Sequence, residues 1–182
     1  FDRAKLLSFN ADFIAAMTDE EFLRRWLAWV AEYEPAAHAK LTALPREKQL
    51  LLAKAVKPRS KTLRDGLKPI EFILAPDEAI VIDPAAKAKA FANGGDGLLR
   101  EVEAALRALP EERWTPSELH GVLESVAKAH NLVNDKGALN VGPVAAPVRV
   151  ALSGAGVTPP LGETLAVLGK TATLARLRRV MT

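Results

Sequence analysis

The chain has 182 residues, of which 26% are charged, and it carries a formal net charge of +3 and no cysteine. This length accommodates one ordinary domain or two small ones, and a hydrophobic content of 49% is typical of a folded protein. The lack of cysteine excludes disulfides, zinc-thiolate sites and cysteine nucleophiles, and it is consistent with a cytoplasmic protein. No apolar run is long enough to span a membrane. Because the chain opens at Phe1 and not at Met, we expect it to be part of a longer polypeptide.

The first 74 residues predict a series of helices. The apolar residues that recur at helical spacing between residues 1 and 17 are Leu6, Phe9, Phe13 and Ile14. Thr18 followed by Glu21 has the pattern of a capping box and predicts a helix to about residue 33. Phe22, Trp26 and Trp29 share one face of that helix, which is typical of a core. Further helices are expected up to residue 40, from residue 45 to 56, and from a turn at residues 57–62 to residue 74, capped by Ser60 or Thr62.

Residues 75–83 are the expected boundary between two parts, because prolines and aspartates interrupt the helical pattern there. Asp83-Pro84 then begins a new helix. The glycine-rich stretch at residues 93–97 lacks the lysine of a phosphate-binding loop, so we interpret it as a helix terminator followed by an N-cap. Helices are expected at residues 98–109, 116–130 (after a capping box at residues 115–118), on both sides of residues 154–157, and at 171–180. Strand signals are nearly absent, so the sequence predicts an all-α fold of two consecutive small helical bundles, residues 1–74 and 75–182.

The stretch from residue 147 to 161 carries the strongest local signal for binding. A short apolar helix containing Arg149 ends at a glycine-broken turn, and Thr158-Pro159-Pro160 opens the next helix. A planar fork of donors beside a helix N-terminus suits a phosphate or the polar edge of a base. The alternative is that Arg149 lies on a solvated helix face and that the turn is only a connector.

Basic residues gather in two places. The first group is Lys54, Lys57, Arg59, Lys61, Arg64 and Lys68, and the second is Arg176, Arg178 and Arg179. Two such patches on a near-neutral body indicate a polyanion held along a defined path, with solvated surface residues as the alternative. No histidine lies at metal-ligand spacing and no nucleophile has an identifiable base, so we expect neither a catalytic residue nor a metal site. The residues taken by themselves predict a basic, helical binding module.

Four segments resemble the C-terminal, anticodon-binding half of the bacterial glutamyl-tRNA synthetases. They are Phe1-Asp2-Arg3-Ala4-Lys5-Leu6 with Asn10 and Phe13-Ile14; Arg59-Ser60-Lys61-Thr62-Leu63; Trp114-Thr115-Pro116; and Pro147-Val148-Arg149-Val150-Ala151-Leu152-Ser153-Gly154 with Leu168-Gly169-Lys170 and Leu174-Ala175-Arg176-Leu177. The match covers essentially the whole chain in the right order, and the last segment is the most specific. Two positions depart from the family pattern: Pro143 stands where a lysine is common, and Ser8 where tryptophan is usual.

The resemblance implies that the two helical bundles form a cage around the anticodon loop of tRNA(Glu), with tRNA(Gln) as a further substrate of some members. Single-stranded loops are recognised through unstacked bases whose edges are hydrogen-bonded, which agrees with a guanidinium beside a turn. The residues expected to contact bases are Arg149, Thr158, Pro159, Leu161 and Arg59, with Arg64 as the alternative to Arg59 for the first anticodon base. The residues expected to contact the RNA backbone are Lys54, Lys57, Lys61, Arg64 and Lys170.

The resemblance also implies a parent enzyme, an ATP-dependent glutamate–tRNA ligase of class I that is cytoplasmic and monomeric. Its ATP-binding signatures, a His-x-Gly-His-type stretch and a Lys-x-Ser-Lys-type loop, do not occur in this sequence. We therefore expect this chain by itself to need no cofactor and not to activate glutamate, ATP and magnesium belonging to the parent enzyme. The alternative function is a stand-alone basic helical module that binds another nucleic acid or a protein partner.

Overall fold

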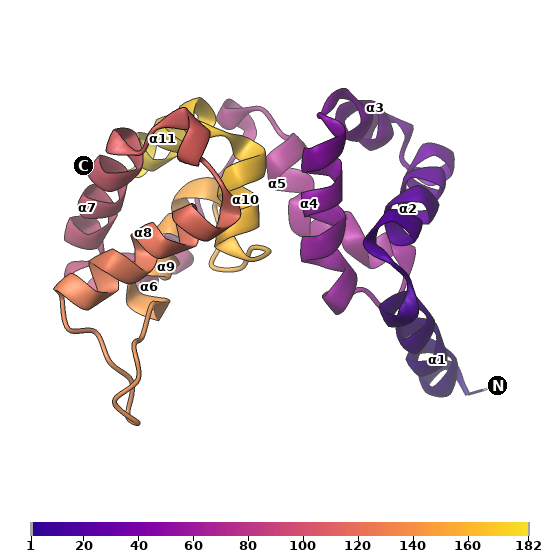
Figure 1. Cartoon of the computed structure of the whole chain (residues 1–182), viewed down its shortest axis with the longest axis horizontal. Coiled ribbons are helices and arrows are strands. Elements are labelled where there is room, and N and C mark those ends of the chain that lie inside the picture. Colours follow the sequence, from indigo (N-terminus) through magenta and orange to yellow (C-terminus); the bar gives the residue numbers. More distant parts are fainter. Residues whose placement is uncertain (1, 182) are drawn as a thin grey trace. The chain divides into compact units, whose positions relative to one another are not determined.

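The structure, a computed structural model, describes residues 2–181, and these form helices joined by turns and by one long loop between α8 and α9 (Figure 1). The only strand-like feature in this range is one isolated antiparallel bridge between Val133 and Leu139. The prediction of an all-α fold is therefore confirmed. None of the helices among these residues has the length and apolar character that a bilayer span requires.

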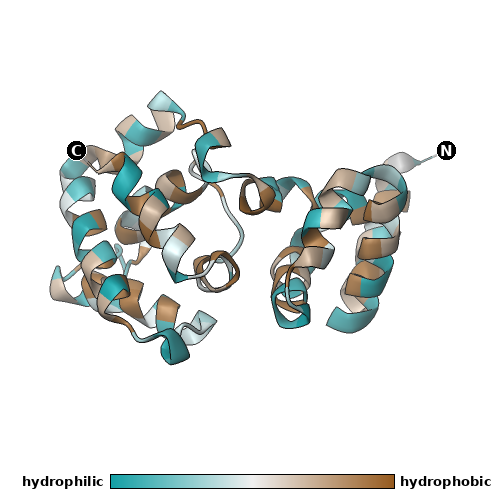
Figure 2. Cartoon of the chain, turned by 90° about the horizontal axis from the view of Figure 1, so that it is seen from above, coloured by the Kyte–Doolittle hydropathy of each residue, from teal (hydrophilic) through white to brown (hydrophobic). Residues whose placement is uncertain are grey.

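The chain divides into two compact units, Phe1–Leu74 and Ala75–Thr182. The α-helices of unit 1 are α1 (Arg3–Ala16), α2 (Asp19–Tyr33), α3 (Pro35–Ala43), α4 (Arg46–Val56) and α5 (Glu71–Leu74). Those of unit 2 are α6 (Pro84–Phe91), α7 (Gly95–Ala108), α8 (Pro116–Ala129), α9 (Gly142–Ser153), α10 (Leu161–Leu168) and α11 (Lys170–Val180). Hydrophobic and hydrophilic residues alternate along these helices (Figure 2), as expected where one side of each helix packs on its neighbours.

The core of unit 1 is built on α2, which packs against α3 and α4. Phe22 and Trp26 are fully buried, and their rings stack with centroids 5.9 Å apart. Trp29 lies at the margin of the core and stacks on Tyr33 at 5.2 Å. The aromatic stripe is thus mainly a core feature, as its helical spacing predicts.

Helix α1 forms where the sequence predicts it, but most of its apolar residues do not pack against unit 1. Ile14 is buried, whereas Leu6, Phe9 and Phe13 are between 52% and 61% exposed. Helical spacing indicates that a helix forms, but it does not indicate which neighbour covers its face. In unit 1 only the C-terminal part of α1 reaches the core.

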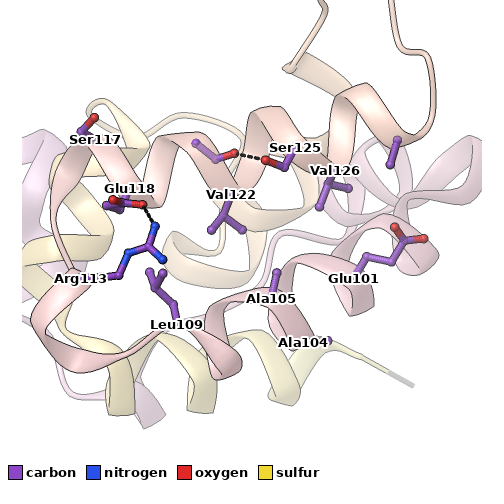
Figure 3. Close-up of a pocket in the computed structure, with 12 residues that line it drawn as sticks. Glu101, Ala104, Ala105, Leu109, Arg113, Ser117, Glu118, Val122, Ser125 and Val126 are labelled. Atoms are coloured by element: carbon purple, nitrogen blue, oxygen red, sulfur yellow. Dashed lines mark hydrogen bonds and ion pairs between the residues drawn. The ribbon is translucent and has the colours of Figure 1, made fainter.

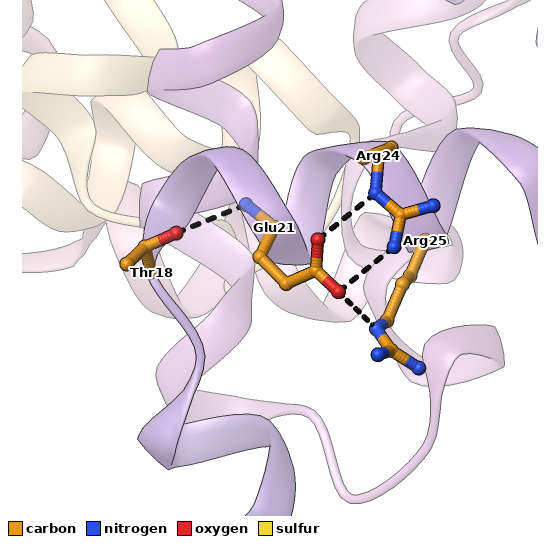
Figure 4. A network of polar contacts seen from close by, with 4 residues as sticks. All are labelled: Thr18, Glu21, Arg24 and Arg25. Atoms are coloured by element: carbon orange, nitrogen blue, oxygen red, sulfur yellow. Dashed lines mark hydrogen bonds and ion pairs between the residues drawn. The ribbon is translucent and has the colours of Figure 1, made fainter.

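The predicted capping box at Thr18 is only half formed. The Thr18 hydroxyl accepts a hydrogen bond from the Glu21 amide at 3.1 Å, as an N-cap should. The Glu21 carboxylate does not reach back to the N-cap amide and instead binds Arg24 and Arg25 (Figure 4). Hydrogen bonds from Arg24 and then Arg25 lower the pKa of Glu21 to about 2. The predicted capping box at Thr115 is half formed in the same way. The Thr115 hydroxyl accepts from the Glu118 amide, but the Glu118 carboxylate binds Arg113 at 2.6 Å.

The prediction of a single helix from the turn at residues 57–62 to residue 74 is wrong. Residues 63–70 form two 3-10 turns, and only Glu71–Leu74 is α-helical. Gly66 lies so close to the core that a β-carbon there would be 3.0 Å from Trp26 Nε1, and Pro69 lacks the amide that a continuing helix needs. Thr62 is the N-cap, whereas Ser60 is buried and donates to the Val56 carbonyl at 3.0 Å.

Unit 2 packs α7 against α8, α9 and α11, with α10 against α8. The glycine-rich stretch acts as predicted: Gly94 has a left-handed φ of 89° and is the N-cap of α7. Residues 75–83 contain a 3-10 turn at Asp77–Ala79 followed by extended backbone. Helix α9 ends at Gly154, whose φ of 79° only glycine adopts at low cost.

Candidate nucleic-acid interface

Arg149 is turned towards the corner that follows the α9–α10 turn. Its Nη1 donates to the Thr158 carbonyl at 3.2 Å, to Thr158 Oγ1 at 2.5 Å and to the Pro159 carbonyl at 3.3 Å. The side chain is half-buried, and these three acceptors hold the Nη1 end of the guanidinium at the corner. The alternative in which Arg149 lies on a solvated face beside a passive connector does not describe this structure.

The other residues of the corner, Thr158, Pro159 and Leu161, are packed into unit 2 next to the guanidinium. The side chains of Thr158 and Leu161 are only 3% and 4% exposed, and Pro159 is buried as well. Thr158 Oγ1 also donates to the Pro159 carbonyl at 2.8 Å, and Thr164 Oγ1 binds the Pro160 carbonyl at 2.9 Å within the first turn of α10. Base contacts from Thr158, Pro159 and Leu161 stay a prediction, while their packing already explains why Arg149 has one orientation.

An extended segment, residues 80–83, runs against the same turn. The Asp83 amide donates to the Gly154 carbonyl at 2.9 Å. A β-carbon added at Gly154 would lie 2.0 Å from the Val81 carbonyl oxygen, so glycine is required both by the backbone angle and by the close approach. The α9–α10 turn is therefore bordered by a stretch of chain about seventy residues upstream.

The predicted C-terminal basic cluster does not consist of three solvent-facing cations, because Arg176 is buried and only Arg178 and Arg179 are exposed. Arg176 is 2% exposed and binds Asp77 Oδ1 at 2.6 Å and the carbonyls of Ala75 and Leu152 at 3.0 Å each. Arg178 binds the buried Glu103 at 2.7 Å.

Arg179 donates to the carbonyls of Asp77 and Ile80. Together with Arg176 it holds residues 75–80 against α9 and α11. The sequence does contain a signal for the burial of Arg176, because Thr173, Arg176 and Val180 recur at the spacing of one buried helix face. A guanidinium can be buried when its donors are satisfied, which is the case here.

The basic stretch of unit 1 lies mostly at the surface. The exposed cations are Lys54, Arg59, Lys61, Arg64 and Lys68. The one acid among them, Asp65, accepts the amides of Lys61 and Thr62 at 3.0 and 2.8 Å and so stabilises the turn itself. Lys57 differs from its neighbours, because its ammonium binds Asp19 at 2.6 Å and the Met17 carbonyl at 2.9 Å.

Lys170 also contributes to the internal structure. It begins α11, is half-buried, and donates from Nζ to the Leu109 carbonyl at 2.6 Å. RNA contacts from Lys57 and Lys170 stay predictions, but in this structure both ammonium groups hold elements of their own unit together. The local sequence contains no sign of this, because the partners lie 40 and 61 residues away.

A separate groove of about 790 Å³ lies between α7 and α8 (Figure 3). Its walls are mainly aliphatic, from residues such as Ala105, Leu109 and Val122, and the Arg113–Glu118 ion pair lies at one end. The residues that line it do not include the Arg149 corner. Among residues 2–181, no group of three or more His, Asp or Glu side chains is placed to hold a metal ion.

Comparison with known proteins identifies the family. Residues 20–181 match the family described as "Anticodon binding domain". The chain is 35% identical to the glutamate–tRNA ligase of Salinispora tropica over 98% of this chain and 36% of that protein. It is 32% identical to the glutamate–tRNA ligase of Corynebacterium efficiens over 98% of this chain and 34% of that protein. It therefore spans about a third of the length of these relatives.

A solved structure shows the same fold. The crystal structure of a glutamate tRNA ligase from Elizabethkingia meningosepticum matches all of this chain and 33% of that chain, with a TM-score of 0.76 and 22% sequence identity. The resemblance to the anticodon-binding half of glutamyl-tRNA synthetases, found in the motifs around Arg59 and Arg149, is confirmed by these matches. Since the family match extends over most of the sequence, this chain belongs to the anticodon-binding domain family.

Proposed function

We propose that this chain is the tRNA-binding part of a glutamate–tRNA ligase and that it binds the anticodon loop of tRNA(Glu). The observation that carries the proposal is the guanidinium of Arg149, fixed by Thr158 and Pro159 at the surface-facing turn between α9 and α10. The family match and the names of the relatives support the same assignment.

The chemistry of the corner suits an opened RNA loop. Bases in such a loop are unstacked, so their hydrogen-bonding edges are available to side chains. An arginine fork can meet two acceptors of one base edge at once, and a fork already held in one orientation loses little rotamer freedom on binding. A lysine in the same place would supply charge without this planar geometry.

The exposed cations of unit 1 provide phosphate contacts, which do not depend on sequence, and one further base contact. Lys54, Lys61 and Arg64 contact backbone phosphates, and Arg59 contacts the first anticodon base. Phosphate contacts release counterions from the RNA, so they make the affinity depend on salt. We assign a structural role to Lys57 and Lys170, because their ammonium groups are already bonded within the chain.

The parent protein in this proposal is an ATP-dependent ligase that acts as a monomer in the cytoplasm. The signatures that hold ATP in this enzyme class do not occur in this sequence, and the proposal assigns ATP and magnesium to the catalytic part of the parent enzyme. This chain contributes the grip on the tRNA and not the activation of glutamate. Whether tRNA(Gln) is also accepted depends on how strictly the anticodon bases are read.

Binding of RNA stem-loops to the chain tests the proposal. A stem-loop with the tRNA(Glu) anticodon should bind more tightly than the same stem with a scrambled loop, and more tightly than duplex DNA of equal length. Arg149→Ala and Arg149→Lys should each cost about 1–3 kcal/mol of binding free energy on the cognate loop only, by analogy with base readout by arginine. Lys128→Ala, which removes one exposed charge of unit 2, is the matched control.

Two results would contradict the proposal. Equal losses for the Arg149 and Lys128 variants on every RNA would leave only non-specific electrostatics. A preference for duplex DNA would favour the stand-alone nucleic-acid-binding module instead. Circular dichroism melting curves of each variant check that a loss of binding is not a loss of folding.

A further inference from the structure

Two exposed valines lie on either side of the contact between residues 80–83 and the α9–α10 turn. Val81 is 83% exposed and Val157 is 81% exposed, which makes them the most exposed large apolar side chains of the described residues. Val81 directly follows the buried Ile80, and its carbonyl is the atom that approaches Gly154. Val157 directly precedes Thr158, the partner of Arg149. Single exposed valines are common, but here one lies on each of the two segments that meet at Gly154, and Val157 is the chain neighbour of Thr158, which binds Arg149.

The backbone that carries Val81 is held firmly. The Ile80 carbonyl accepts from Arg179 at 3.2 Å, and the Asp83 amide donates to Gly154 at 2.9 Å. Just upstream, the buried Arg176 binds Asp77 and the Ala75 carbonyl. These bonds, from a guanidinium that is itself buried, tie the extended segment to α11. The result is an apolar side chain presented in a constant position.

A base removed from its stack needs a replacement surface for its faces. Proteins usually provide aromatic rings, and stacking on them accounts for much of the binding energy. The large exposed aromatic residues of the described chain, Phe9, Phe13 and Tyr33, all belong to unit 1. In unit 2, Trp114 is half-buried and donates from Nε1 to the Leu165 carbonyl at 3.0 Å. Near Arg149, aliphatic side chains are therefore the exposed apolar surface.

We propose that Val81 and Val157 form an apolar wall against which one unpaired base of the bound loop lies while Arg149 hydrogen-bonds to the edge of a base. This inference rests on the proposed function and adds to it a role for residues 80–83, which are far from Arg149 in sequence. The branched side chains contact the face of the base, and the hydrogen bonds at Ile80 and Asp83 keep Val81 in place before the RNA arrives.

Binding of the anticodon stem-loop to serine and phenylalanine variants tests the wall. Val81→Ser should weaken binding about 5-fold to 10-fold, within the range lost when a stacking surface is truncated, and Val81→Phe should restore or exceed the original affinity. Val157→Ser should behave like Val81→Ser. Val133→Ser, at a valine that is 57% exposed on the loop between α8 and α9, is the matched control and should bind as the unchanged chain does.

A set of stem-loops with one abasic nucleotide at each loop position locates the base. At the position that meets the wall, the unchanged chain and Val81→Ser should bind equally, because the face that the valine contacts is gone. Retention of affinity within twofold by both serine variants, with Arg149→Ala still impaired, would overturn the wall and leave the proposed function intact. A chain that does not distinguish the cognate loop from a scrambled one would instead overturn the proposed function itself. Because Val81 and Val157 are exposed, the melting curves of their variants should not change.

Discussion

Replacing Gly154 by alanine is the most direct test of how the α9–α10 turn is built. Gly154 has a φ of 79°, and a β-carbon there would lie 2.0 Å from the Val81 carbonyl oxygen and 3.0 Å from its carbonyl carbon. Both of these atoms belong to the backbone, which cannot move aside as the end of a flexible side chain could. The segment at residues 80–83 must therefore shift away from the turn.

The expected cost follows from three contributions. A left-handed conformation costs a non-glycine residue about 1–2 kcal/mol. Loss of the hydrogen bond from the Asp83 amide to the Gly154 carbonyl removes about 0.5–1.5 kcal/mol. The lower conformational entropy of unfolded alanine offsets about 0.4–1 kcal/mol of this loss. We expect Gly154→Ala to lower the free energy of unfolding of unit 2 by about 1–3 kcal/mol, taking these together.

Native-state hydrogen exchange measures this loss where it should occur, in the slowest amides of α9. Gly156→Ala is the matched control, because Gly156 lies two residues away, has no positive φ and has open space where a β-carbon would be. It should change stability by less than about 0.5 kcal/mol. If the two alanine variants were equally stable, the close approach of Val81 to Gly154 would not exist in solution. Gly154→Ala should also weaken binding of the stem-loop, since it displaces Val81.

Three further predictions concern charged residues. Lys54→Ala should reduce the slope of log K against log salt for RNA binding by about one unit without changing stability. Lys57→Ala should instead lower the free energy of unfolding of unit 1 by about 1–2 kcal/mol in urea titrations, because Lys57 is paired with Asp19. A loss of stability for Lys54→Ala together with unchanged stability for Lys57→Ala would refute the assignment of a binding role to Lys54 and a structural role to Lys57. Arg176→Met should destabilise unit 2 by about 2–4 kcal/mol, since it leaves buried acceptors without a donor, and a neutral result would show that the guanidinium is not needed there. The pKa of Glu21 is lowered to about 2, so its ion pairs add stability above its ordinary value of 4.5 and lose it as the pH falls towards 2. Carboxyl NMR titration should show this pKa, and Glu21→Gln should remove this part of the acid sensitivity; a titration midpoint near 4.5 would contradict the arrangement.

The roles of the two halves of a capping box show where local sequence is a sufficient guide. The hydroxyls of Thr18 and Thr115 cap their helices as predicted, because the hydroxyl and the amide that it accepts are three residues apart on one turn. The carboxylates of Glu21 and Glu118 go to arginines instead, since a guanidinium within reach is a stronger partner than a backbone amide. The start of a helix depends on residues close together in the sequence, whereas the partner of a long side chain depends on which other groups lie within its reach.

The C-terminal arginines show where local sequence is insufficient. Arg176, Arg178 and Arg179 look alike in sequence, yet Arg176 is buried and the other two lie at the surface of the same helix. The acceptors that distinguish Arg176 and Arg179 lie on residues 75–80, about a hundred positions upstream. No window of sequence includes both, so the apparent basic patch could be recognised as an internal clamp only from coordinates.

The sequence by itself determined the all-α class, most helix starts, the family, and the placement of Arg149 beside Thr158 and Pro159, because turns, caps and helical periodicity act between residues close together in the chain. The tertiary structure decided which cations face solvent, which apolar face of α1 stays exposed, and that residues 80–83 lie against the Arg149 turn. These outcomes depend on burial and on hydrogen bonds between distant segments, and burial is settled only when the segments have packed against one another.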